Sequence, residues 1–162
     1  MIWKRTLKME LKEFIEKVDQ ILRFNFGYTY KFEPANPSYN YNSNGDSYNW
    51  TFDFDPNNNK GVCPSALSIV VYTGTSRVPN QEKGKIGLFY TSVLYHITPT
   101  GNHSLTTKSF DTTSNLKKIE KFKFDNLYKW AECQKSIYNN YTQILKMKDI
   151  DKRLKELNKD FE

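Results

Sequence analysis

The sequence has few of the residues from which metal centres and disulfide networks are built. Its 162 residues include two histidines and two cysteines. A zinc site needs three or four such ligands, usually in short paired spacings such as CxxC, and neither pair has that spacing. We therefore predict no metal site. We also expect Cys63 and Cys133 to be reduced thiols, although a lone disulfide stays open, because no export signal is visible.

The motifs of nucleophilic and phosphate chemistry are missing as well. There is no GxSxG elbow, and Gly84 and Gly87 lie beside a strand rather than in a strand–loop–helix phosphate cradle. Asp53 and Asp55 could share one strand face, about 7 Å apart, and hold Mg²⁺. That pair is equally the ordinary polar side of an alternating strand. The sequence predicts no catalytic residues and no cofactor.

Long apolar runs are also missing. No stretch approaches the roughly 18 apolar residues that a membrane span needs. The amino-terminal residues contain no apolar signal-peptide region. We expect a cytoplasmic protein without membrane contact. The length suits a single domain with its own core.

The charge balance is basic, and arginine is scarce. The chain carries 24 Lys and Arg against 18 Asp and Glu, a formal net charge of +6. A basic excess favours polyanionic partners such as nucleic acid or an RNA-bearing complex. The abundance of Lys, Asn, Tyr and Phe is also typical of an AT-rich genome, so part of the charge reflects codon usage. The balance does argue against an acidic DNA mimic.

The longest strand-forming stretch is Gly84–Thr98, GKIGLFYTSVLYHIT. Both alternating sets of side chains are largely apolar or aromatic, and no charge follows Lys85. This pattern predicts a strand covered on both faces, and we expect it to be the central strand of a sheet. Within it, His96 is expected to be a hydrogen-bonded core residue. His103 falls in the following turn and is expected to be solvated.

An amphipathic helix is predicted over Thr6–Arg23, where apolar residues recur at three-and-four spacing. Five further stretches, the last two weaker, predict strands, and Asn44-Gly45 predicts a hairpin turn. The last strand carries lysines opposite phenylalanines, as a protected edge strand would. These strands are Tyr28–Phe32, Tyr48–Phe54, Ala66–Thr73, Ser104–Phe110 and Ile119–Phe124.

Asp125 is predicted to cap a long C-terminal helix, which the sequence allows to break near 146–149. Past that point, apolar residues alternate in spacings of three and four among charges, which suits the narrow seam of a coiled coil. They are Met147, Ile150, Leu154, Leu157 and Phe161. We predict one α+β domain over 1–146 with an antiparallel sheet of five or six strands. The tail over 147–162 either packs back on the sheet or self-associates as a homodimer.

The most distinctive loop runs from Asn36 to Trp50 and sets tyrosines and a tryptophan among asparagines and serines. Such a surface can stack on bases, hold a sugar or contact a protein, or its rings can pack back on the sheet. Basic residues from two other segments could join it in one groove. The candidate partner-binding residues are Tyr39, Tyr41, Tyr48, Trp50, Arg77, Lys83, Lys85, Lys117, Lys118, Lys121 and Lys123.

These features predict a non-catalytic binding protein that engages nucleic acid or a protein–nucleic-acid complex. The alternative is an inhibitor that acts by protein–protein contact, such as an anti-CRISPR-like protein of a phage or mobile element, or a toxin-immunity protein. A nuclease-like enzyme using Asp53 and Asp55 is the weaker alternative. A nucleic-acid reader should bind with strong salt dependence. An inhibitor should present a partly apolar exposed surface.

Overall fold

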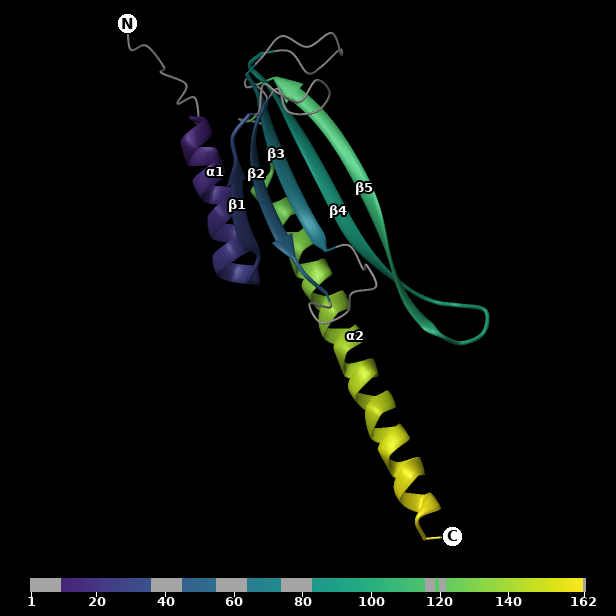
Figure 1. Ribbon diagram of the computed structural model, residues 1–162. Coiled ribbons are helices and arrows are strands. Elements are labelled where there is room, and N and C mark those ends of the chain that lie inside the picture. The colour runs from purple at the N-terminus through teal and green to yellow at the C-terminus, as the bar shows by residue number, and fades with distance from the viewer. Residues whose placement is uncertain are drawn as a thin grey trace, which may run out of the picture.

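The protein is an α+β fold in which helices flank five antiparallel strands along the chain (Figure 1), as the sequence predicted. The structure is a computed structural model that describes residues 10–35, 45–54, 64–73, 83–115, 119 and 122–161. Within this part of the chain, no helix combines the length and hydrophobicity that a bilayer crossing requires. The elements in order are α1 (Leu11–Asp19), the π-helical turn η1 (Gln20–Asn25), β1 (Thr29–Glu33), β2 (Gly45–Phe52), β3 (Ser65–Tyr72), β4 (Lys85–Ile97), β5 (His103–Asn115) and α2 (Phe124–Lys159).

The sheet is a simple meander, with every strand antiparallel to its chain neighbour. Its order, β1-β2-β3-β4-β5, makes β3 the central strand. The prediction that Gly84–Thr98 is central is therefore wrong, because only β5 lies beyond β4. A strand predicted over Ile119–Phe124 would have added another neighbour. Instead, Phe124 is the first residue of α2.

Aromatic packing explains why that last strand does not form. The two phenylalanines of the Lys-Phe-Lys-Phe pattern at 121–124 pack against α1 instead of alternating across a sheet. The ring centroids of Phe14 and Phe122 are 5.1 Å apart, and those of Phe14 and Phe124 are 5.8 Å apart. The same alternating pattern thus fits the start of α2, where both phenylalanine rings contact Phe14 of α1.

β4 and β5 continue past the rest of the sheet as a two-stranded ribbon (Figure 1). Pairing between β3 and β4 reaches only Ala66 and Thr91, whereas β4 and β5 pair as far as Ile97 and His103. In this extension Leu94 and Ile97 are exposed. The prediction of a strand covered on both faces therefore fails for the end of β4, because β3 is too short to follow it.

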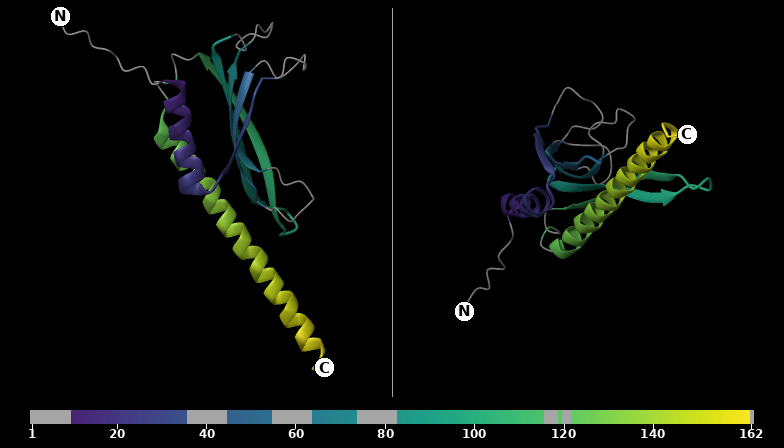
Figure 2. Two further views of the ribbon diagram at one scale, coloured as in Figure 1. Left: turned by 60° about the vertical axis from the view of Figure 1, so that its left-hand side comes forward. Right: turned by 90° about the horizontal axis from the view of Figure 1, so that it is seen from below.

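Both helices cover the same face of the sheet (Figure 2). Strand register places Trp50, Leu67 and Tyr90 in one row across β2, β3 and β4 on that face. The core forms between this face and the helices from Phe14, Val18, Leu22, Phe26, Tyr28, Trp50, Leu67, Ile69, Ile86, Ile119, Leu127 and Ala131. Burial of these large apolar side chains is the main driving force for folding.

On the opposite face of the sheet, polar side chains of β1, β2 and β3 are linked by hydrogen bonds. The hydroxyls of Thr29 and Thr51 lie 2.9 Å apart, and the Ser68 hydroxyl donates to the Asn49 amide oxygen at 2.5 Å. Cross-strand pairs of this kind stabilise a sheet face that no helix covers.

The N-terminal helix is shorter than predicted and ends differently. α1 covers Leu11–Asp19, and η1 carries the helix on to Asn25. The predicted start at Thr6 lies outside the described residues. Gly27, at φ 74°, then turns the chain into β1. Strand β1 forms as predicted, but it is exposed along its whole length rather than half-buried, because it is an edge strand.

α2 is one unbroken helix of 36 residues, so the predicted break near 146–149 does not occur. The segment contains neither proline nor glycine, the usual causes of a kink. The predicted cap Asp125 lies inside the first turn. Lys123 precedes the helix with an extended backbone and no side-chain cap.

Several individual side chains also differ from expectation. His96 is exposed rather than in the core, and His103 begins β5 and hydrogen-bonds the Tyr95 hydroxyl rather than being free in a turn. Cys133 on α2 is a free, exposed thiol. Gly45 is a strand residue and not part of a turn; a Cβ there would come within 2.7 Å of the Val71 carbonyl oxygen. Its predicted turn partner, Asn44, lies outside the described residues.

Candidate docking surfaces on α2

The predicted aromatic binding loop is described only at its end, in β2. Trp50 is fully buried, and its indole Nε1 donates a hydrogen bond to Asp19 Oδ1 at 2.9 Å. An indole without exposed surface cannot stack on a base, so Trp50 is a core residue. Tyr48 is half-buried, with its ring 5.1 Å from that of Phe32. Burial raises the pKa of the Tyr48 hydroxyl.

The described members of the predicted basic group divide between two layers. Lys83 is exposed in the turn before β4, and Lys85 is the first residue of that strand. Alternation along β4 places Lys85 on the face opposite Tyr90, which contacts α2. Lys123 lies in the helical layer, directly before α2. The other candidates lie outside the described residues; they are Tyr39, Tyr41, Arg77, Lys117, Lys118 and Lys121.

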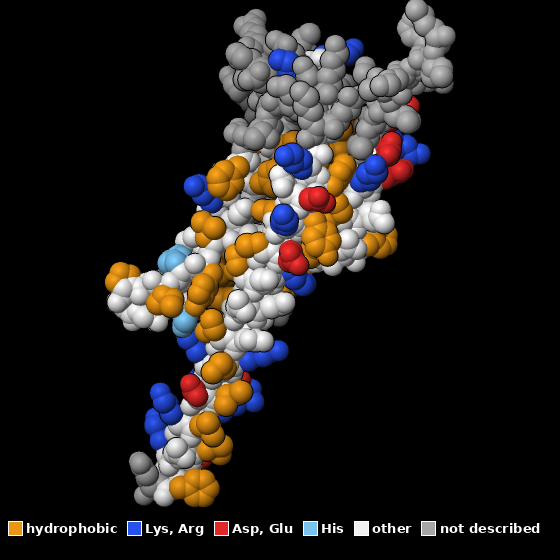
Figure 3. All heavy atoms as spheres, turned by 180° about the vertical axis from the view of Figure 1, so that it is seen from behind, with side chains coloured by type: hydrophobic (Ala, Val, Ile, Leu, Met, Phe, Trp, Pro, Cys, Tyr) orange, Lys and Arg blue, Asp and Glu red, His pale blue; other side chains and the backbone are white. Residues whose placement is uncertain are grey.

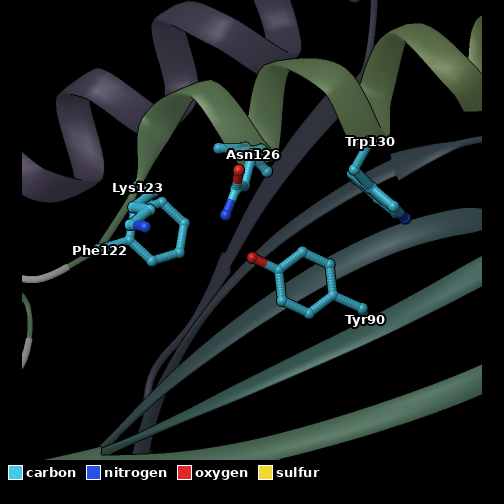
Figure 4. A pocket seen from close by; sticks show the side chains of 6 residues that line it. Tyr90, Phe122, Lys123, Asn126 and Trp130 are labelled. Atoms are coloured by element: carbon cyan, nitrogen blue, oxygen red, sulfur yellow. The ribbon is translucent and has the colours of Figure 1, made fainter.

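A cleft of about 460 Å³ lies between the start of α2 and β4 (Figure 4). Aromatic side chains form much of its wall, and the hydroxyl of Tyr90 points toward Asn126. Trp130 is held in place because its Nε1 donates to Ser92 Oγ at 2.8 Å. The lining residues are Tyr90, Phe122, Lys123, Asn126, Leu127 and Trp130.

The chemistry available in this cleft is mainly aromatic, with Lys123 as the one charged residue of its described lining. Burial raises the pKa of Tyr90 to about 12, so its hydroxyl stays protonated near neutral pH and can donate a hydrogen bond. Among the described residues, no three His, Cys, Asp or Glu side chains come together as a metal site. Asp53 follows β2, and its predicted partner Asp55 lies outside the described residues.

The second half of α2 extends away from the sheet into solvent (Figure 2). From Met147 onward, including Phe161 in the turn after the helix, its apolar residues are all exposed, from 53% for Leu154 to 86% for Phe161. They form a stripe along the projecting helix (Figure 3). We name this stripe the seam; it consists of Met147, Ile150, Leu154, Leu157 and Phe161.

The apolar side of α2 changes partway along the helix. In the first half, Trp130 and Gln134 hydrogen-bond residues of β4. The ring of Tyr138 packs against Phe52 of β2 and against Phe54, which follows that strand. At 3.6 residues per turn, the seam lies about 180° around the helix axis from this sheet-contacting side. The seam therefore does not continue the contact with the chain's own sheet.

A row of lysines continues the sheet-contacting side instead. Lys148, Lys152, Lys155 and Lys159 are exposed and line one shallow groove together with Asp151 and Glu156. The projecting helix thus presents an apolar face and, roughly opposite, a basic face.

Sequence spacing predicted the seam, but it gave no sign of the cleft. Tyr90 and Trp130 come from elements far apart in the chain, and only the sheet register brings them to 5.2 Å between ring centroids. The lysine row could have been found from its spacing of four, three and four residues, which keeps side chains on one helix face.

Comparison of the chain with protein-family models, with curated proteins and with solved structures finds no match.

Proposed function

We propose that this is a non-catalytic binding protein that acts through protein–protein contact, with the seam of α2 as its docking surface. The single observation that carries the proposal is the exposure of four consecutive apolar heptad positions on a helix that leaves its own domain, with the exposed Phe161 in the turn that follows. Exposed apolar stripes of this kind mark interaction sites, because leaving them in water costs free energy. A cytoplasmic inhibitor or immunity protein would use such a surface.

The rest of the fold supports a role in which the domain holds the seam out toward a partner. Leu127 and Ala131 are buried under the sheet, and Gln134 hydrogen-bonds the β4 backbone, so the first half of α2 is anchored. A helix that is already formed has no nucleation cost when it docks. The domain therefore holds the seam ready for a partner helix or groove.

Site-specific photo-crosslinking in cells that produce the protein tests this proposal. A photoreactive residue at position 154 lies in the seam, and the matched control at position 152 lies on the lysine face of the same turn. We expect a covalent protein adduct from position 154 and none, or far less, from position 152. Failure of position 154 to form an adduct, or equal yields at both positions, would overturn the proposal.

Nucleic-acid binding is the second candidate, and the lysine row favours it. Lys148, Lys152, Lys155 and Lys159 extend over about 16 Å of helix at 1.5 Å per residue. A row of this length could follow a phosphate backbone, and the net charge of +6 would add to the attraction. The carboxylates of Asp151 and Glu156 in the same groove weaken this attraction to phosphates.

A gel-shift assay against DNA and RNA at low and high salt separates the two candidates. A shift that weakens steeply with salt, and weakens further in Lys152→Glu, would support nucleic-acid binding. Unshifted probes at low salt would exclude it. The Leu154→Glu variant serves as the control, because it alters the seam and leaves the lysine row in place.

A further inference from the structure

We infer that the occupant of the seam is a second copy of this chain, paired as a parallel two-stranded coiled coil over Met147–Leu157. This inference rests on the proposed function and names the partner. Its basis is the seam's own geometry, the charges that flank it, and the position of the domain relative to it.

The seam has the pattern of a self-pairing helix. The spacing of three, four, three and four places Met147, Leu154 and Phe161 at one core position of the heptad, and Ile150 and Leu157 at the other. In a parallel pair each residue faces its own counterpart, so the four layers from Met147 to Leu157 lie within α2, and Phe161 follows in the turn after the helix.

The flanking charges also favour parallel self-pairing. In a parallel coil, the residue before one core position lies near the partner residue five places further along. Lys146 then meets Asp151 of the other copy, and this happens twice by symmetry. Arg153 meets Asn158, so no like charges face each other. The flanking residues are polar throughout, which suits a narrow two-stranded seam better than a wider bundle.

The domain does not obstruct this arrangement. Because the seam lies about 180° around α2 from the sheet-contacting side, the partner helix approaches from the side away from the sheet. The side of α2 in line with the seam is polar and exposed at Glu132, Ser136, Asn139 and Gln143. The two sheets then lie on the outer sides of the dimer.

Light scattering during size-exclusion chromatography tests the inference on the full-length protein. We expect a mass twice the 19.1 kDa of one chain at micromolar concentration, and a single-chain mass for the double variant Leu154→Glu/Leu157→Glu. Lys152→Glu is the matched control, since it changes the net charge by the same two units on the lysine face, and it should stay dimeric. Circular dichroism at 222 nm should show that all three proteins are folded.

Oxidative crosslinking tests the parallel register. In a background with Cys63→Ser and Cys133→Ser, Leu154→Cys should form a disulfide-linked dimer, because the two copies of that position face each other. Lys152→Cys should not. A dimer whose position 154 fails to crosslink overturns the parallel register.

The outcomes separate this inference from the proposed function. A monomeric wild-type protein that still crosslinks through position 154 to a different protein would overturn self-pairing and leave the docking role intact. A monomer without any adduct would overturn both. A dimer that survives Leu154→Glu/Leu157→Glu, or a larger oligomer, would overturn the two-stranded coil, because another surface or a wider bundle would then hold the copies together.

Discussion

The side-chain amide of Gln134 on α2 completes the backbone hydrogen bonding of Val93 on β4. The Val93 N–H donates to Gln134 Oε1 at 2.7 Å, and Gln134 Nε2 donates to the Val93 carbonyl oxygen at 3.3 Å. Val93 lies just past the last β3–β4 pair, so β3 provides no partner there. The amide of Gln134 takes the place of the missing strand.

Replacing this glutamine should therefore destabilise the fold strongly. Gln134→Leu removes both hydrogen bonds and leaves two buried backbone groups of Val93 unsatisfied. We expect a loss of about 2–4 kcal/mol in the free energy of unfolding, measured by urea titration. Gln143→Leu, at an exposed position of the same helix, should change it by less than about 0.5 kcal/mol. Equal stability of the two variants would contradict the role given to Gln134.

The contact between Asp19 and Trp50 gives a second prediction. Asp19→Ala leaves the buried Trp50 N–H without an acceptor and should cost about 1–3 kcal/mol of unfolding free energy. Asp19→Asn keeps an oxygen acceptor and should cost less. Arg23→Ala removes the ion pair to Asp19 and the contact of Arg23 with the exposed Phe24 ring, and should cost under about 1 kcal/mol. Thermal denaturation should rank Asp19→Ala as the least stable variant, Asp19→Asn as the next and Arg23→Ala as the most stable. A reversed order would refute the hydrogen bond assigned to Asp19 and Trp50.

Stability should fall in the alkaline range because of two buried tyrosines. Burial raises the pKa of Tyr28 and of Tyr90 from 10.0 to about 12, and a hydrogen bond with Ser65 offsets part of the effect at Tyr28. The unfolded chain loses these protons near pH 10, whereas the folded chain keeps them until about pH 12. The stabilisation is therefore complete below pH 10 and is lost as the pH rises toward 12.

The size of this loss can be measured by urea titration between pH 9 and pH 11.5. Each tyrosine should contribute on the order of 1 kcal/mol of lost stability at pH 11. Tyr90→Phe keeps the ring but cannot ionise, so its stability should fall less steeply with pH than that of the wild type. Parallel slopes for the two proteins would show that Tyr90 titrates normally.

Removing the tail should leave the domain intact. A chain that ends at Lys146 lacks the seam and the lysine row, both of which are exposed. At concentrations where the monomer dominates, its unfolding free energy should match that of the full chain within about 1 kcal/mol. A large loss of stability would mean that the tail packs back on the sheet, which is the other arrangement that the sequence allowed.

Periodic segments were the part of this protein most open to prediction from sequence. The α1 stripe, the alternating strand β2 and the seam spacing each reflect a local period that burial imposes on the chain. The Lys-Phe-Lys-Phe stretch at the start of α2 misled for the same reason, since alternation alone does not say whether a sheet neighbour is present.

The candidate site was less accessible to sequence reasoning. The lysine row and the seam each depend on residue spacing within one helix, so the sequence of that helix is enough to predict them. The cleft beside Tyr90, the buried role of Trp50 and the exposure of His96 depend on strand register and strand length, which arise from contacts between distant segments.

By itself, the order of residues determined the class of fold, the antiparallel strands and the apolar tail of the last helix, because each follows from local periodicity and turn chemistry. Tertiary structure alone decided that β3 is central, that Gln134 completes β4 and that the seam lies away from its own sheet. Those outcomes depend on where helices and strands of different length meet, and no local pattern contains that information.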